Sequence, residues 1–434
     1  MSRDGEQMSA WTRRGFLGAS LRRGTALGAG IALPGLGVES TLFAAADPKI
    51  AGSGGASSPG IRRRSRLGQT GIEIPDISFG TFSLEHDEQL VLHALDRGIT
   101  HFDTAEGYTE GRAESVLGRA LRGRRHEVTL TSKFWARPDH TAAHQMKVLE
   151  TSLRRLGTDY VDIYLNHAVN ELERLDSPEW LAFAERAKRE GKIRAIGMSG
   201  HSGRLVECLA HALDERLVDV VLVAYNFAQT PSYKEQVKRY LQDLAASFDF
   251  VTTQPMLPEM LARAKASGVG VMVMKTLQGA RKNDMRPFES AGRTFAQAAF
   301  RWVLSEPAVD GLVVSMTSRE MVDEYVEASG SGPPDLADLA LLARYASRHA
   351  GTSCVVGCGA CVSACPAQVA IPDVMRTRMY ALDYGIERVA RREYASIGGH
   401  AAACLGCSGE PCATACPSGI PIAQWNRETH QRLG

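Results

Sequence analysis

The sequence predicts a (β/α)8 TIM barrel over residues 62–330 and a small, mainly helical domain over residues 335–434. Eight short apolar runs alternate with amphipathic segments through the first region, and eight such units fit the roughly 250 residues typical of this barrel. No G-x-G-x-x-G sequence follows the first run, which disfavours the alternative of a doubly wound, dinucleotide-binding sheet. Eight of the nine cysteines lie beyond residue 353, after the turn-forming sequence SGSGPP at residues 329–334.

Residues 1–46 have the plan of an export signal. Arg13 and Arg14, followed by Phe16 and Leu17, resemble a twin-arginine signal; an apolar stretch and three alanines at residues 44–46 follow. Residues 47–61 predict a flexible linker. The resemblance implies a bacterial protein located in the periplasm or otherwise outside the cytoplasm, with no stable membrane span after cleavage. An uncleaved anchor is the alternative, disfavoured by the glycines and proline within the apolar stretch.

The composition indicates a globular protein. Hydrophobic residues make up 44% of the chain and charged residues 23%, and the formal net charge is +1. This balance gives no sign of a nucleic-acid partner.

The predicted strands are rich in Val, Ile and Met, as buried parallel strands are. In chain order they lie at residues 76–82, 99–105, 127–132, 160–166, 192–199, 218–226, 268–276 and 310–316. Apolar residues at helical spacing predict connecting helices at residues 87–98, 142–157, 178–191 and 293–307. The long connection from Phe227 to Ser267 predicts an inserted helix from Lys234 to Ala245.

Polar residues stand where three of these strands end. Asp103, Lys133 and His167 occupy carboxyl ends of strands, where barrel enzymes hold their active sites, and Tyr108 lies in the loop after Asp103. A tyrosine, with a pKa of about 10, can protonate a nascent alkoxide near neutral pH if a neighbouring cation eases its ionisation. We expect Lys133 to supply that cation, Asp103 to hold it, and His167 to orient the substrate oxygen. Taken singly, Asp103 and Lys133 could form a structural ion pair, and His167 could be a histidine that only ends a strand. Their joint placement on successive strand ends favours a catalytic role.

The sequences HFDTAEGY, TSK and LNH around these four residues resemble the aldo-keto reductase family, and the resemblance covers the whole predicted barrel. It implies that Asp103, Tyr108, Lys133 and His167 form the family's catalytic tetrad. It also implies hydride transfer between NAD(P)H and an aldehyde, ketone or sugar carbonyl, so that the small-molecule partner is a carbonyl compound or an alcohol.

The same resemblance implies contacts to the nicotinamide cofactor. The sequences FGT, GMSGH and MKTLQG match the family, and the contacts they imply are Gly80, Thr81, Ser199, Lys275, Leu277 and Gly279. Leu222 stands where many relatives place a glutamine, and Met316 where NADP-preferring members often place a lysine. Thr317 and Arg319 remain as contacts for a 2′-phosphate, and the choice between NAD and NADP stays open.

The C-terminal cysteines form two similar motifs. The first comprises Cys354, Cys358, Cys361 and Cys365, the second Cys404, Cys407, Cys412 and Cys416, and each ends in Cys-Pro. Each follows the C-x2-C-x2-C-x3-C-P pattern of bacterial [4Fe-4S] ligands with one spacer lengthened, so we expect two [4Fe-4S] clusters. A zinc ribbon needs no fourth cysteine before proline, and disulfides between such close neighbours are strained.

The tail resembles the helical dicluster ferredoxins, because helical sequence separates the two motifs. In two-cluster ferredoxins the fourth cysteine of each motif serves the other cluster, which implies that Cys365 joins Cys404, Cys407 and Cys412. By the same rule, Cys416 joins the first three cysteines, and ligation within each motif is the alternative. Cys208 lies on a predicted barrel helix and is expected to serve packing.

Two functions from different classes fit this sequence. The first is an exported carbonyl reductase or alcohol dehydrogenase whose tail exchanges electrons with a redox partner protein. The second is a non-catalytic electron-transfer or binding protein with a reductase-derived barrel. The intact tetrad favours the first.

Overall fold

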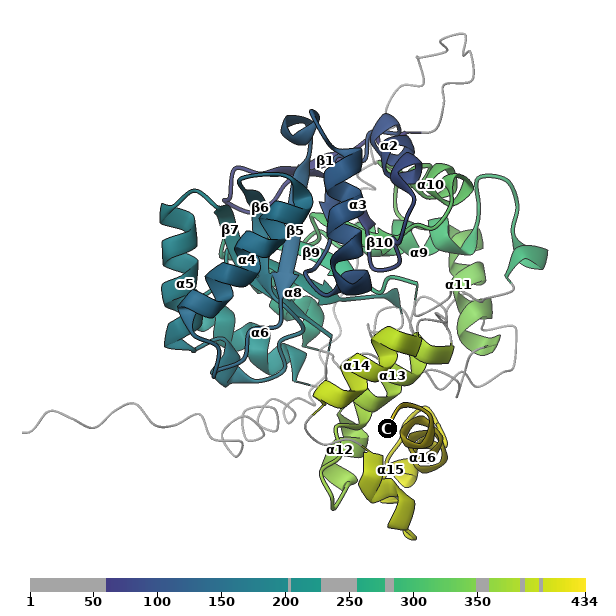
Figure 1. Cartoon of the computed structure of the whole chain (residues 1–434). Coiled ribbons are helices and arrows are strands. Elements are labelled where there is room, and N and C mark those ends of the chain that lie inside the picture. The colour runs from purple at the N-terminus through teal and green to yellow at the C-terminus, as the bar shows by residue number, and fades with distance from the viewer. Residues whose placement is uncertain are drawn as a thin grey trace, which may run out of the picture. The chain divides into compact units, whose positions relative to one another are not determined.

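The computed structural model describes residues 60–201, 204–227, 256–277, 285–348, 359–382, 387–397 and 401–434. Within these ranges, eight parallel strands close into a barrel in the order β10-β3-β4-β5-β6-β7-β8-β9 (Figure 1). The strands are β3 (Ile77–Gly80), β4 (His101–Asp103), β5 (Thr129–Phe134), β6 (Val161–Asn166), β7 (Ile193–Gly200), β8 (Val220–Ala224), β9 (Gly270–Met274) and β10 (Gly311–Ser315). The predicted TIM barrel and all eight of its strands are confirmed.

Helices connect the strands and cover the outside of the barrel. They are α2 (Glu88–Asp96), α3 (Arg112–Ala120), α4 (Ala142–Leu156), α5 (Pro178–Arg189), α6 (Leu205–Asp214), α8 (Leu257–Ala266), α9 (Phe295–Leu304) and α10 (Arg319–Val326). Local sequence fixes their ends: the Thr141 side chain caps the first turn of α4, and Gly157 ends that helix in the left-handed conformation. The four predicted helices are confirmed, whereas the predicted helix from Lys234 to Ala245 lies outside the described residues.

A hairpin that the sequence did not predict precedes the barrel. It pairs β1 (Arg64–Arg66) with β2 (Glu73–Pro75). Leu67, Ile72 and Ile74 from this hairpin join the apolar cluster inside the barrel. Gly68 has a φ of +54° and lies against the backbone at the start of β9, where a Cβ atom would clash. The hairpin therefore closes the amino-terminal end of the barrel and leaves the carboxyl ends of the strands for the site.

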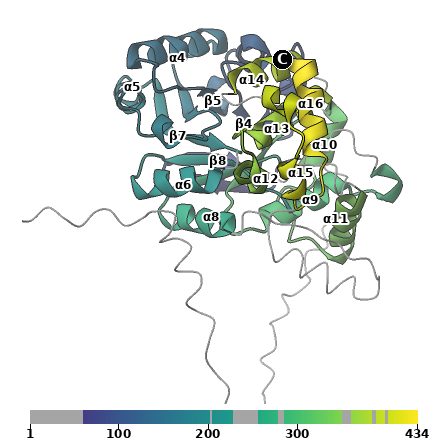
Figure 2. The ribbon, with the colours of Figure 1, turned by 90° about the horizontal axis from the view of Figure 1, so that it is seen from below.

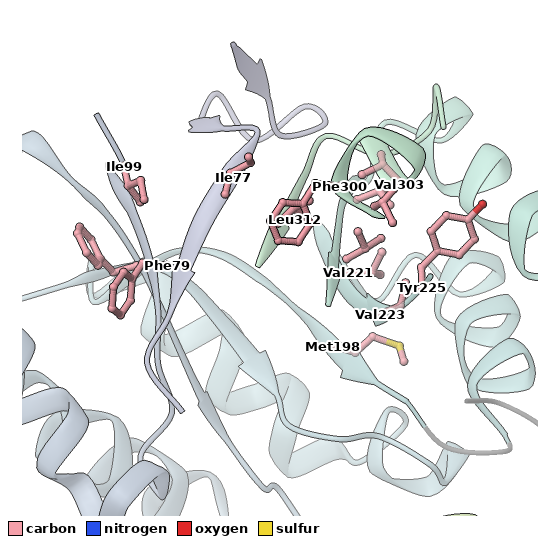
Figure 3. Close-up of a cluster of buried hydrophobic side chains, with 14 of the residues drawn as sticks. Ile77, Phe79, Ile99, Met198, Val221, Val223, Tyr225, Phe300, Val303 and Leu312 are labelled. Atoms are coloured by element: carbon pink, nitrogen blue, oxygen red, sulfur yellow. The ribbon is translucent and has the colours of Figure 1, made fainter. Parts of the chain in front are cut away.

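The barrel has two apolar layers, because side chains alternate across each strand. Ile163 and Leu165 on β6 point inward to the inner cluster, while Tyr164 between them packs outward with the helices. Figure 3 shows part of the outer layer, where Val221 and Val223 of β8 lie near Phe300 and Val303 of α9.

The chain continues from the barrel into α11 (Leu336–Arg348), which packs on α9. The rings of Tyr345 and Phe295 stack with centroids 4.2 Å apart, and Arg301 donates to Asp338 at 2.8 Å. The apolar core of the barrel thus extends beyond residue 330.

The remaining helices have an apolar cluster of their own. They are α12 (Ala360–Ala364), α13 (Ile371–Leu382), α14 (Glu387–Ser396), the 3-10 helix η7 (Ala401–Gly406), α15 (Pro411–Thr414) and α16 (Ile422–Leu433). Helices α13, α14 and α16 pack against one another, as Figure 2 shows. Among the residues with described structure, no helix is long and apolar enough to cross a membrane.

Candidate active site

The four predicted catalytic residues meet at the carboxyl end of the barrel. Asp103 ends β4 and Lys133 lies near the end of β5, and the pairing of these strands brings the two side chains together. The Lys133 Nζ atom donates to Asp103 Oδ1 and to the carbonyl of Thr104, both at 2.6 Å. The Tyr108 ring lies with its centroid 4.9 Å from Nζ and 5.7 Å from the ring centroid of His167. The four residues predicted from the sequence therefore converge in space.

Burial controls the protonation of this group. Lys133 is 1% exposed and Asp103 3% exposed. Burial lowers the pKa of Lys133 and raises the pKa of Asp103, and their ion pair opposes both shifts. Burial, followed by Lys133, holds the pKa of His167 well below its usual 6.5. His167 is therefore neutral near pH 7 and can donate a hydrogen bond from its ring without carrying charge.

Tyr108 keeps its proton in this state. Burial raises the pKa of Tyr108 well above its usual 10, and the Asp103 carboxylate adds to the effect. Lys133 Nζ, 4.9 Å from the ring centroid, is the neighbouring cation that we expect to ease ionisation of the phenol during proton transfer. A phenol that stays protonated is suited to donate when negative charge develops on a neighbouring oxygen.

The four residues line a cavity of about 210 Å³. Several residues predicted to contact the cofactor line the same cavity: Gly80, Ser199, Lys275 and Leu277, together with the noted Leu222. A Cβ atom on Gly80 would press on Val313 and Val314 of β10, so glycine is required for close strand packing there.

Other predicted cofactor residues lie elsewhere. The Thr81 hydroxyl donates to the carbonyl of Asp103 at 3.0 Å, so Thr81 supports the strand end and does not line the cavity. Thr317 and Arg319 are exposed around the start of α10 and also lie outside the lining. Met316 is 2% exposed, so its thioether is part of the core. Gly279 lies outside the described residues.

Unusual backbone conformations gather at this cavity. Thr109, Glu110, Ala168 and Lys275 have φ values between +46° and +60°, although none is glycine. Thr109 and Glu110 are the two residues after Tyr108, and Ala168 is the residue after His167. Ala168 and Lys275 also line the cavity. Such conformations are costly for residues with a Cβ atom and are held by their surroundings, typically at functional sites.

The sequence did not identify the residues that the tail contributes to this cavity. Arg376 and Tyr380 of α13 and Glu393 of α14 line it, as does Phe82 from the loop after β3. The Phe82 ring lies 5.1 Å from both the Tyr108 and the Tyr380 rings. Spacing of four residues between Arg376 and Tyr380 indicates one helix face, but no sequence signal says that this face covers the barrel.

The cysteines of the second motif gather in the tail. Cys404 of η7 and Cys412 of α15 are buried, and the Asn426 amide lies 3.7 Å from the Cys404 sulfur. Burial raises the pKa of Cys404, and Cys365 and Cys407 raise it further. Burial likewise raises the pKa of Cys412, with Cys404 and Cys365 adding to the shift.

Cys365 of the first motif therefore lies within electrostatic reach of the second motif. Cys361 and Cys416 also belong to or pack against the tail's apolar cluster. Over the described part of the chain, no three His, Cys, Asp or Glu side chains are arranged to hold a metal ion. Cys354 and Cys358 lie outside the described residues. On barrel helix α6, Cys208 is buried in the core, consistent with packing.

Comparisons with known proteins identify the barrel. The sequence profile of the Aldo/keto reductase family matches residues 67–333. L-glyceraldehyde 3-phosphate reductase of Escherichia coli (strain K12) is 25% identical over 300 residues, which cover 60% of this chain and 86% of that protein. The uncharacterized oxidoreductase YqkF of Bacillus subtilis is 25% identical over 293 residues, covering 62% and 92%.

A solved structure agrees with this match. An aldo-keto reductase from Klebsiella pneumoniae, in complex with NADPH, superposes with a TM-score of 0.50 at 28% identity, covering 66% of this chain and 95% of that one. The family profile alone spans more than half of the sequence. The chain therefore belongs to the aldo/keto reductase family and is an oxidoreductase of that type.

Proposed function

We propose that this protein interconverts the carbonyl group of an aldehyde, ketone or sugar and the corresponding alcohol. The observation that carries the proposal is the convergence of Asp103, Tyr108, Lys133 and His167 on one cavity. NAD(P)H, when bound, supplies a hydride to the carbonyl carbon and leaves as NAD(P)⁺. Tyr108 gives its phenolic proton to the carbonyl oxygen, which completes the alcohol.

The other three residues support that proton transfer. Neutral His167 donates a hydrogen bond that orients the carbonyl oxygen. The Lys133 ammonium stabilises the phenolate that Tyr108 becomes once its proton has left. Asp103 keeps Lys133 charged and in place through the 2.6 Å ion pair. In the oxidative direction the same groups act in reverse.

Residues beside the tetrad fit a nicotinamide dinucleotide. Ser199 and Leu277 line the cavity, and Lys275 offers a cation for a pyrophosphate. Thr276 also lines the cavity, and its buried hydroxyl has no hydrogen-bond partner among the described residues. The NADPH complex of the Klebsiella pneumoniae relative supports the same assignment.

Replacing the proton donor tests the proposed function. Tyr108→Phe should lower kcat by about 10²- to 10⁴-fold while NADPH binding changes little, because the phenol acts only on the developing alkoxide. Steady-state turnover and fluorescence titration with NADPH measure the two effects. Tyr160→Phe, a matched change before the start of β6 at the opposite end of the barrel, should retain activity. Equal turnover by wild type and Tyr108→Phe would overturn the assignment.

We also propose that the tail binds two [4Fe-4S] clusters and exchanges single electrons with a redox partner protein. The chemistry of the donors fits, because thiolates are the usual ligands of such clusters. Cys404 and Cys412 are both buried, and Cys365 adds to the rise in the pKa of each, which supports the exchange of the fourth ligand between the motifs. No disulfide occupies Cys365, Cys404, Cys407, Cys412 or Cys416.

Export by the twin-arginine route is a third proposal. It rests on Arg13 and Arg14, which precede the described residues, and a route that carries folded proteins suits a chain that assembles clusters before export. Replacing both arginines by lysine should retain the protein in the cytoplasm with its N-terminus uncleaved. Cell fractionation and N-terminal sequencing check this, and unchanged export of the double variant would reject the route.

A further inference from the structure

The tail packs over the loops that carry the catalytic residues. An ion pair joins Arg388 of α14 to Glu110, two residues after Tyr108. The Arg392 guanidinium lies directly against Gly107, where a Cβ atom would clash with it. Phe82 of the barrel packs on the apolar cluster of the tail. These contacts place α13 and α14 beside the catalytic loop.

Arg376, Tyr380 and Glu393 of the tail form one wall of the cavity, called here the tail wall. It combines hydrogen-bond donors, acceptors and an aromatic ring. The Arg376 guanidinium donates to Glu393 and to Asp373, both at 3.2 Å. Arg376 is 8% exposed, and its buried Nε atom has no hydrogen-bond partner within the described residues. Lys275 donates to the Tyr380 hydroxyl at 3.3 Å. Arg376 nevertheless lines the cavity, and its two bonds to carboxylates leave further guanidinium N–H groups for a ligand.

The charges of this wall disfavour an anion as its ligand. Two carboxylates, Asp373 and Glu393, surround the single guanidinium of Arg376, and Glu393 itself faces the cavity. A substrate anion beside Glu393 would be repelled by that carboxylate, and Lys275, the cation bonded to Tyr380, is assigned to the pyrophosphate of the cofactor. A hydroxyl group both accepts and donates, so it can satisfy Arg376 and Glu393 together.

We propose that α13 and α14 form the substrate-recognition wall of the active site and that this wall selects an uncharged carbonyl compound bearing hydroxyl groups. The inference rests on the proposed carbonyl reduction. The Arg376 guanidinium, which lines the cavity, donates to a substrate hydroxyl oxygen, and the Glu393 carboxylate accepts from a substrate hydroxyl. The rings of Phe82 and Tyr380 cover the carbon skeleton. The domain that carries the cysteines thus also sets the substrate specificity of the barrel.

Three aldehydes that differ stepwise test this wall with anaerobically prepared, full-length protein and NADPH: propanal, glyceraldehyde and glyceraldehyde 3-phosphate. Wild type should prefer glyceraldehyde to propanal by about 100-fold or more in kcat/KM, because buried groups built for hydroxyls are left unpaired by propanal. Arg376→Met should reduce that preference by about 10- to 100-fold, mainly through KM for glyceraldehyde.

Two further variants separate recognition from folding. Arg391→Met makes the same change at an exposed position of α14 and should leave the preference intact. Arg376→Gln keeps a hydrogen-bond donor and should restore part of the preference. Calorimetric binding of erythritol to the NADP⁺-loaded protein gives a readout without turnover, and Arg376→Met should weaken it about tenfold or more while Arg391→Met does not.

Each contrary outcome has a distinct meaning. Preference for glyceraldehyde 3-phosphate would show that the wall recognises an anion and would overturn the inference. Equal use of propanal and glyceraldehyde by wild type would do the same while leaving the proposed carbonyl reduction intact. Absence of all turnover would reject the proposed function, and erythritol binding that is insensitive to Arg376→Met would then also reject the wall.

Discussion

The barrel and the tail hold their buried functional groups in place by different means. In the barrel, a closed ladder of parallel strands fixes Asp103 and Lys133 on neighbouring strands, and the ion pair follows from the register. In the tail, Cys361 lies on the five-residue helix α12 and Cys412 on the four-residue helix α15. Helices this short are not stable by themselves, since even about 12–15 residues are marginal in water.

This difference indicates what each region requires. The barrel positions its tetrad with backbone hydrogen bonds and two apolar layers, so its site is formed by the protein alone. The tail has a smaller apolar cluster in which cysteines are themselves buried members. The proposed clusters would cross-link these cysteines and so stabilise the tail. The predictions below test this contrast.

The largest effect is expected from Lys133→Met in the barrel. It removes the cation beside Tyr108 and leaves Asp103 as an uncompensated buried carboxylate, so kcat should fall by about 10²- to 10⁴-fold and unfolding free energy by about 3–5 kcal/mol. Turnover assays and urea unfolding measure both. Lys147→Met, an exposed change on α4, is the control. Iron content should not change, and a wild-type level of activity would refute the role given to Lys133.

A second prediction concerns the ligands of the tail. Purified anaerobically, the protein should hold about eight irons per chain, and Cys404→Ser should reduce this to about four. Cys365→Ser should lose the same cluster as Cys404→Ser, judged by the electron paramagnetic resonance spectrum that remains, because the proposed ligation assigns these cysteines to one cluster. Cys361→Ser should lose the other cluster, which is assigned to the first three cysteines of the first motif and to Cys416.

The controls for this experiment lie within the same chain. Cys208→Ala should keep all the iron, since burial raises the pKa of Cys208 to about 12 and no other cysteine accompanies it on α6. If Cys365→Ser instead matches Cys361→Ser, each motif binds its own cluster. Stoichiometric zinc without a cluster spectrum would reject the clusters altogether.

The smallest effect is a pH dependence of barrel stability. His101 bridges Ser78 and Thr131 inside the barrel, and burial lowers its pKa to about 3. As the pH falls, His101 is therefore protonated in the unfolded chain before it is protonated in the folded chain. The contribution of His101 to the free energy of unfolding is complete above about pH 6.5 and decreases below that pH. The slope is at most about 1.4 kcal/mol per pH unit for one histidine. His101→Gln should flatten the slope between pH 6.5 and pH 4, measured by urea unfolding, whereas the exposed His126→Gln should not.

Much of the fold was predictable because its signals are local. Apolar runs of strand length repeat eight times, with amphipathic segments between them and helix ends such as Gly157, so the barrel follows from the pattern. The hairpin from Arg64 to Pro75 was missed because three-residue strands leave too short a pattern to recognise. The four candidate catalytic residues could be predicted to converge because the carboxyl ends of barrel strands always face one side.

Sequence alone determined the barrel, the catalytic tetrad as a candidate set and the two cysteine motifs, because each depends on a pattern along the chain, and the family through the resemblance of short motifs around the tetrad. Tertiary structure decided that α11 completes the barrel core and that Arg376, Tyr380 and Glu393 face the tetrad. It also decided that burial keeps Tyr108 protonated and His167 neutral. The physical reason is that packing between segments far apart in the chain sets burial and contact, and no periodicity within one segment records which surface will cover it.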